Sequence, residues 1–172
     1  DLTSLSLDLV GKSEVSATGM AVGGVSWRRG RLQYEHADDR LRITLPAASR
    51  AGETLRVTIE YGGVPADGLI IATNVHGDRT FFGDNWPNRA RHWIPAVDHP
   101  YDKAAVDWTI IAPDHYQVVA NGLLVEETDL EEGLRLSRWR ERTPIATKVM
   151  VIGVARFAMQ SLRPLNGTPI QT

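Results

Sequence analysis

Most of this chain alternates between apolar and polar residues with a period of two, as in Leu5-Ser6-Leu7-Asp8-Leu9. Because successive side chains of a strand point to opposite faces, the pattern predicts half-buried β-strands. The expected strands are 5–9, 41–45, 54–61, 106–112, 116–120, 123–127, 134–139 and 147–157. The runs 106–112 and 148–157 are more continuously apolar, which predicts strands that are covered on both faces.

Turn-forming residues separate these strands. Asn121-Gly122 lies between two apolar runs and predicts a two-residue hairpin, in which both turn positions have positive φ. Asn166-Gly167 marks another turn near the end. No helical pattern persists for ten residues, and the best helical candidate is one turn around Tyr101–Ala105. The chain is therefore predicted to be all-β, a mostly antiparallel, two-sheet, sandwich-like domain over residues 1–172.

Composition and charge exclude several classes of function. The chain has 172 residues, a formal net charge of -2 and no cysteine. It has no basic stripe for nucleic acid and no apolar run long enough to span a membrane. Disulfides and zinc–thiolate sites are excluded. No signal peptide pattern is present, so a secreted, a periplasmic and a cytoplasmic location all fit.

The residue pattern contains no complete catalytic motif. None of the five histidines belongs to an H-E-x-x-H pair, and no serine lies in a G-x-S-x-G elbow. Metal sites need three or four convergent ligands, and the histidines read more simply as surface residues. We therefore expect no catalytic residue, no metal ligand and no cofactor within this fragment.

The irregular segment Gly62–Pro95 interrupts the strand rhythm and is rich in Gly, Asn, Asp, Arg and aromatic residues. Loops carry binding residues more often than scaffold strands do. Trp86 and Trp93 lie in or beside this segment, and Trp108 follows it. One interpretation is a free-standing carbohydrate- or peptide-binding module that uses the three tryptophans as a platform. The simpler interpretation is that they anchor the core, except at Trp86, where the two are balanced.

Several segments, in order, resemble one family. Ala90-Arg91, Pro95, Asp98, Pro100 and Lys103-Ala104 match a motif that reads A-R-x-x-F-P-C-x-D-E-P-x-x-K-A in aminopeptidase N and leukotriene hydrolase relatives, with Ala96 and His99 in place of Cys and Glu. The segments around Gly52, Gly122 and Pro144 resemble three further motifs of that family. The chain is thus similar to the N-terminal domain of a zinc metallopeptidase of bacterial type, in peptidase family M-one.

The resemblance implies a saddle-shaped β-domain from a larger multi-domain peptidase, in which the catalytic domain and the first strands lie outside this chain. Zinc is bound by the catalytic domain, which is the expected partner together with a peptide substrate. The N-terminal domain covers the cleft and helps to bind the peptide N-terminus. The family residue that holds this terminus, Gln or Glu, falls on Trp86 here. An indole cannot accept a hydrogen bond from an ammonium group, although a cation–π contact is possible.

The resemblance also implies roles for two short segments. The loop Asp84, Asn85, Trp86 and Pro87 is expected to wall the substrate cleft, with Asp84 or Asn85 as the polar contact and a cis Trp86-Pro87 bond. Asp98, Pro100 and Lys103 are expected to shape a turn without catalysing, because Asp98 can accept hydrogen bonds from nearby backbone N–H groups.

Overall fold

The computed structural model describes residues 1–28, 30–165 and 168–171. Every strand pair within its sheets is antiparallel, and the helical elements are short 3-10 turns. The elements are β1 Leu2–Asp8, β2 Gly19–Trp27, β3 Gly30–Arg31, β4 Tyr34–Ala37, β5 Arg40–Ser49, β6 Val57–Val64, β7 Leu69–Thr73, β8 Arg79–Gly83, η1 Ala90–His92, β9 Lys103–Pro113, β10 Gln117–Ala120, β11 Leu123–Asp129, η2 Glu131–Gly133, β12 Leu134–Ala146, η3 Thr147–Val149, β13 Ile152–Ala155, β14 Ser161–Leu165 and β15 Thr168–Gln171. The Asn166-Gly167 turn lies outside the described residues.

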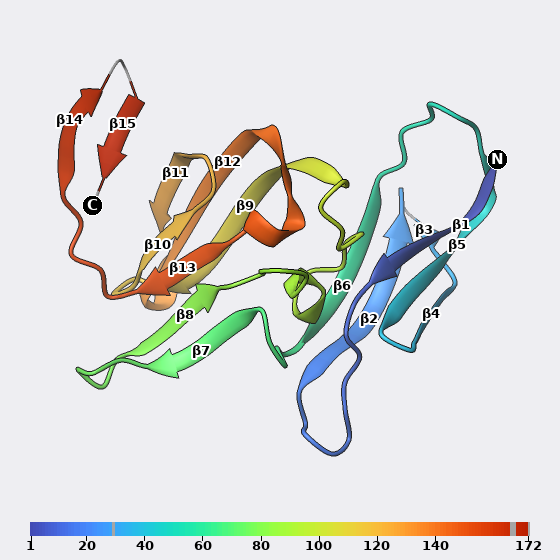
Figure 1. The fold of residues 1–172 in the computed structure, drawn as a ribbon, viewed down its shortest axis with the longest axis horizontal. Helices are drawn as coiled ribbons and strands as arrows, with labels where there is room; N and C mark the ends of the chain where they lie inside the picture. The colour runs from blue at the N-terminus through green and yellow to red at the C-terminus, as the bar shows by residue number, and fades with distance from the viewer. Residues whose placement is uncertain (29, 166–167, 172) are drawn as a thin grey trace.

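Four of the sheets form two sandwich-like halves, which lie at opposite ends of the molecule in Figure 1. In the first half, sheets β1-β5-β4 and β3-β2-β6 enclose a core that includes Met20, Val25, Leu41 and Ile43. In the second half, sheets β10-β13-β8-β7 and β11-β12-β9 enclose another core. The buried residues of that core are Val118, Trp139 and Val154. The all-β, antiparallel, sandwich-like fold expected from the alternation is confirmed.

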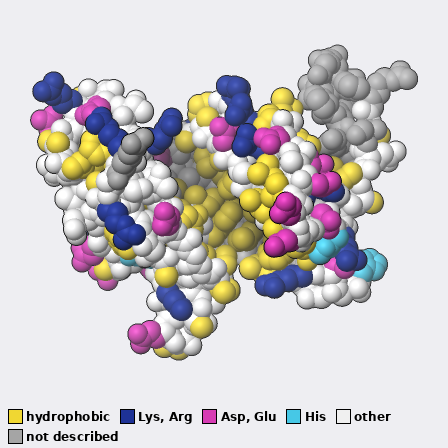
Figure 2. Space-filling view, turned by 180° about the vertical axis from the view of Figure 1, so that it is seen from behind, with side chains coloured by type: hydrophobic (Ala, Val, Ile, Leu, Met, Phe, Trp, Pro, Cys, Tyr) yellow, Lys and Arg dark blue, Asp and Glu magenta, His cyan; other side chains and the backbone are white. Residues whose placement is uncertain are grey.

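Two tryptophans join the halves. Trp93 belongs to the first core and stacks on Trp108 of β9, with ring centroids 5.8 Å apart and planes 9° apart. Trp108 packs against both cores, as does Ile152. Figure 2 shows apolar side chains gathered in the hollow between the two ends of the molecule. Stacked aromatic rings contribute more than their buried area alone, so this contact helps to fix one half against the other.

The predicted hairpin at Asn121-Gly122 is wrong. β10 and β11 belong to different sheets, and β11 pairs with β12 instead. The Asn121 side chain donates to the carbonyl of Val149 at 2.8 Å and accepts from the amide of Val151 at 2.7 Å. Only Gly122 has positive φ, 89°, where its backbone passes against Arg140. The dipeptide therefore carries the chain between sheets, because its side chain bonds to a distant segment rather than to its own turn.

Four further expectations are corrected by the structure. The segment Gly62–Pro95 contains the paired strands β7 and β8, which the strand prediction had missed along with β2 and β4. Lys103 to Ala105 belong to β9 rather than to a helical turn, and β9 is exposed on one face. Residues 147–149 form η3, so the predicted strand 147–157 shortens to β13.

Among the residues that the structure describes, no helix has the length and apolar character that a membrane span requires.

Candidate functional site

The loop Asp84–Pro87 leaves the end of β8 and leads to η1. Its first residue is fixed by a hydrogen bond of 2.6 Å from the Asp84 amide to the Gly68 carbonyl. The Trp86-Pro87 peptide bond is cis, as predicted. The Trp86 side chain is not packed in the core, since 61% of its surface is exposed. The loop thus presents an indole to solvent from a fixed backbone.

Asn85 differs from its neighbour, because it is 1% exposed. Its Nδ2 donates to the carbonyls of Thr147 at 3.0 Å and Met150 at 2.6 Å. Its Oδ1 accepts from Trp93 Nε1 at 2.8 Å. Every polar atom of the side chain is therefore used inside the domain. Asn85 is unavailable as a polar contact for a substrate and anchors the loop instead.

Asp84 remains accessible and is held by an arginine. Its Oδ2 accepts from Arg89 Nη1 at 3.1 Å, and Arg89 Nε lies 3.4 Å from Asp67 Oδ2. The Asp84 side chain is 48% exposed. Two carboxylates share one guanidinium here, so the group carries one net negative charge at the start of the loop. This charge suits a cationic partner.

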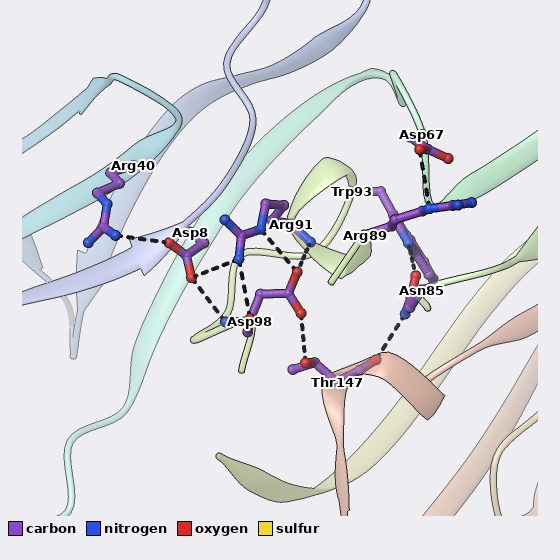
Figure 3. A network of polar contacts seen from close by, with 9 residues as sticks. All are labelled: Asp8, Arg40, Asp67, Asn85, Arg89, Arg91, Trp93, Asp98 and Thr147. Atoms are coloured by element: carbon purple, nitrogen blue, oxygen red, sulfur yellow. Dashed lines mark hydrogen bonds and ion pairs between the residues drawn. The ribbon is translucent and has the colours of Figure 1, made fainter. Parts of the chain in front are cut away.

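Asp98 is the centre of a second network, drawn in Figure 3. Its Oδ2 accepts from both the backbone amide and Nε of Arg91, each at 3.2 Å. Its Oδ1 accepts from Thr147 Oγ1 at 2.8 Å, and the Asp98 side chain is fully buried. Thr147 also accepts from Asn85 through its carbonyl. The two networks therefore meet at η3, where Thr147 bonds to both.

The same network reaches the first sandwich half. The Asp98 amide donates to Asp8 Oδ2 at 3.1 Å, and Asp8 lies within ion-pair distance of Arg91 at 3.8 Å and of Arg40 at 3.7 Å. Buried carboxylates need such partners, because an unpaired buried charge is costly. Asp98 therefore ties η1 and η3 to β1.

Pro100 and Lys103 lie beyond this network. Pro100 lies inside a turn that is closed by a 3.0 Å hydrogen bond from the Asp102 amide to the His99 carbonyl. Lys103 then opens β9, opposite Ala146 of β12. The turn is present, but the Asp98 carboxylate accepts from Arg91, seven residues earlier, rather than from the residues that follow it.

The three tryptophans do not form one platform. Trp93 is 9% exposed and is stacked on Trp108 within the structure, whereas Trp86 faces solvent elsewhere. Lys148 of η3 lies over the Trp86 ring, with Nζ 4.7 Å from the ring centroid. Sequence reasoning missed Lys148 and Thr147. The family motif around Pro144 extends to Thr147 but indicates no role for that residue, and Lys148 carries no local signal.

Tyr61 of β6 contacts the chain just after η1. Its hydroxyl donates to the Trp93 carbonyl at 2.9 Å. Burial raises the pKa of this phenol, because desolvation disfavours the phenolate.

Among the described residues, no group of three or more His, Asp or Glu side chains is arranged to hold a metal ion.

Together, the fold and the loop define an all-β domain that presents an anchored loop with an exposed indole. A family model described as the peptidase M1 N-terminal domain matches residues 16–149. The chain therefore belongs to the family of peptidase M1 N-terminal domains, whose structural neighbours are M1 zinc metallopeptidases.

Solved structures agree with this assignment. The M1 zinc metallopeptidase from Deinococcus radiodurans is 25% identical with a TM-score of 0.80, over 99% of this chain and 38% of that chain. A mutant of the M1 zinc metallopeptidase from Deinococcus radiodurans, bound to a Tyr-Ser-Ala substrate, gives 25% identity and a TM-score of 0.80, over 99% of this chain and 39% of that one. The chain thus spans well under half the length of these structures. Among curated proteins, no sequence matches the chain.

Proposed function

We propose that this chain is the accessory N-terminal domain of a zinc-dependent aminopeptidase, and that the loop Asp84–Pro87 walls the substrate cleft of a catalytic domain. The catalytic domain would bind the zinc ion, and a peptide would be the substrate. The observation that carries the proposal is the contrast between two adjacent residues. Asn85 is buried and bonded on all sides, and Trp86 next to it is 61% exposed. An exposed large aromatic on a fixed loop is typical of a recognition site.

Asp84 is the polar contact that the structure favours for the peptide N-terminus. Asn85 is excluded by its burial, and an indole cannot accept a hydrogen bond. The Asp84 carboxylate is half exposed, and its only bonded partner among the described residues is Arg89. Its second oxygen therefore has capacity for an ammonium group. Trp86 would form the apolar wall beside it.

Kinetics of the full-length protein would test this proposal. With an aminoacyl substrate, Trp86→Ala and Asp84→Asn are each expected to raise KM about three- to tenfold, the effect of losing one partly exposed contact. Val75→Ser is the matched control, because Val75 is 95% exposed at the turn between β7 and β8. Unchanged kinetics in both variants would contradict the cleft-wall role.

A further inference from the structure

The exposed side chain of Trp86 and the half-buried side chain of Lys148 are held side by side through their bonded neighbours. Asn85, which precedes Trp86, donates from Nδ2 to the carbonyl of Thr147, which precedes Lys148. One hydrogen bond of 3.0 Å thus fixes the loop against η3. The Lys148 ammonium group then lies 4.7 Å from the centre of the indole ring. This distance is within the range of a cation–π contact.

The backbone that carries Lys148 is fixed on its other side as well. Asn121 bonds to the carbonyl of Val149 and to the amide of Val151, at 2.8 and 2.7 Å. Asn85 also donates to the carbonyl of Met150 at 2.6 Å. A backbone fixed in this way loses little further freedom when a ligand binds. The backbone that carries the Trp86–Lys148 pair is therefore preorganised, and the cation–π contact holds the two side chains together.

The chemistry of the pair fits an anion. No salt bridge among the described residues involves Lys148, whereas the nearby Asp84 already has Arg89 as its partner. The ring offers exposed apolar surface beside this ammonium group. A carboxylate would pair with Lys148 while its apolar neighbour packs on Trp86. A cationic group at the same place would be repelled by Lys148.

We propose that Trp86 and Lys148 form a binding site for a carboxylate that is attached to an apolar group. The assignment of this carboxylate to a peptide substrate rests on the proposed cleft-wall function. The carboxylate site and the Asp84 site carry opposite charges on different elements, so they do not compete for one group. Lys148 is then a specificity-determining residue rather than a catalytic one.

A charge series of small probes tests the site in the 172-residue chain. N-acetylphenylalanine carries a negative charge, its amide is neutral, and phenylalanine amide carries a positive charge, with the same ring in all three. Binding is measured by NMR from shifts of the Trp86 indole and the Lys148 side chain. We expect the carboxylate to bind about three- to tenfold more tightly than the neutral amide, which is the strength of one exposed charge contact. The positive probe carries the kind of group that is assigned to Asp84, so it should bind without shifting the signals of the Lys148 side chain.

Four variants locate the effect. Lys148→Met should reduce the ratio of the two affinities to about one, and Lys148→Arg should retain the preference. Trp86→Ala should weaken binding of the charged and neutral probes alike. Lys12→Met is the matched control, because Lys12 is an exposed lysine in the loop before β2, and it should keep the preference. Equal affinities of the carboxylate and the neutral amide in the unsubstituted chain, or a preference that survives Lys148→Met, would each overturn the proposal.

Two peptides identify the source of the carboxylate. N-acetyl-Phe-Glu-amide and N-acetyl-Phe-Gln-amide differ only in a side-chain carboxylate. A preference for the Glu peptide, lost in Lys148→Met, supports an acidic side chain, and equal binding of the two leaves the C-terminal carboxylate as the ligand. The result is independent of the kinetic test above. Normal carboxylate binding with unchanged enzyme kinetics would refute the cleft-wall function alone, whereas altered kinetics without a carboxylate preference would refute this site alone.

Discussion

Substituting Asp98 with alanine removes the carboxylate on which η1, η3 and β1 converge. The Asp98 side chain is fully buried, and three groups donate to its oxygens: the Arg91 amide, Arg91 Nε and Thr147 Oγ1. After the substitution, Thr147 Oγ1 loses its bonded partner inside a buried region. The Asp98→Ala chain should therefore be clearly less stable.

The size of the loss follows from these partners. A hydrogen bond to a charged group contributes about 1.5–3 kcal/mol, and removing one partner of a buried ion pair costs about 3–5 kcal/mol. Arg91 is 31% exposed and keeps its contacts with Asp8 and with the Asp98 carbonyl, so water and these groups recover part of the loss. We expect the free energy of unfolding to fall by about 3 kcal/mol. If Asp98 only capped a turn, as the sequence predicts, the same substitution would lower the free energy of unfolding by about 0.5–2 kcal/mol.

Urea unfolding of the 172-residue chain, followed by tryptophan fluorescence, measures this loss. Thr147→Val alone should cost about 1 kcal/mol, and the double variant should lose about 1 kcal/mol less than the sum of the two single losses. The matched control is Asp129→Ala, because its carboxylate is 72% exposed in an ion pair with Arg135. That change should stay within about 0.5 kcal/mol. A loss for Asp98→Ala no larger than the control would refute the central role of this carboxylate.

Other parts of the structure lead to further predictions. Because burial raises the Tyr61 pKa, the folded chain holds the phenol proton more tightly than the unfolded chain does. The contribution of this group to stability is therefore complete below the ordinary pKa of 10.0 and is lost as the pH rises through the raised pKa. Tyr61→Phe should flatten this alkaline loss in denaturation curves, and near pH 7 it should cost about 1 kcal/mol through the lost bond to Trp93. Gly122→Ala should destabilise by about 1–3 kcal/mol in urea melts, since a Cβ there would meet the Arg140 backbone at positive φ. Asn85→Ala should cost about 2–4 kcal/mol in the same assay, because it leaves Trp93 Nε1 and two carbonyls without their partner. The 172-residue chain should hold no stoichiometric zinc and cleave no aminoacyl anilide; one tightly held zinc per chain by metal analysis, or chelator-sensitive turnover, would contradict this.

Alternation was enough to predict the fold class and most long strands, because it reports directly which side chains are buried. β5 shows this most clearly, since Leu41, Ile43 and Leu45 are buried between exposed residues. The missed strands lack the signal for physical reasons. β2 is rich in glycine, and the irregular composition around β7 and β8 concealed a regular hairpin.

The candidate site could be predicted only in part. The cis Trp86-Pro87 bond was predicted correctly. The sequence could not separate Asn85 from Asp84, because the distant carbonyls of Thr147 and Met150 decide which of the two side chains is buried. The hairpin prediction at Asn121-Gly122 failed for the same reason. This dipeptide is typical of a hairpin turn, but a hydrogen bond from Asn121 to a residue 28 positions away decides its role. Lys148 carries no local signal at all, since its partner ring lies in another segment.

A structure of the full-length protein with a bound peptide tests the central claim most directly. The account predicts that Trp86 and Asp84 line the cleft above the zinc ion, with the Trp86 ring in van der Waals contact with the peptide and Asp84 near its N-terminus. A loop Asp84–Pro87 that faces bulk solvent, or that lies away from the zinc-bound peptide, would contradict the account.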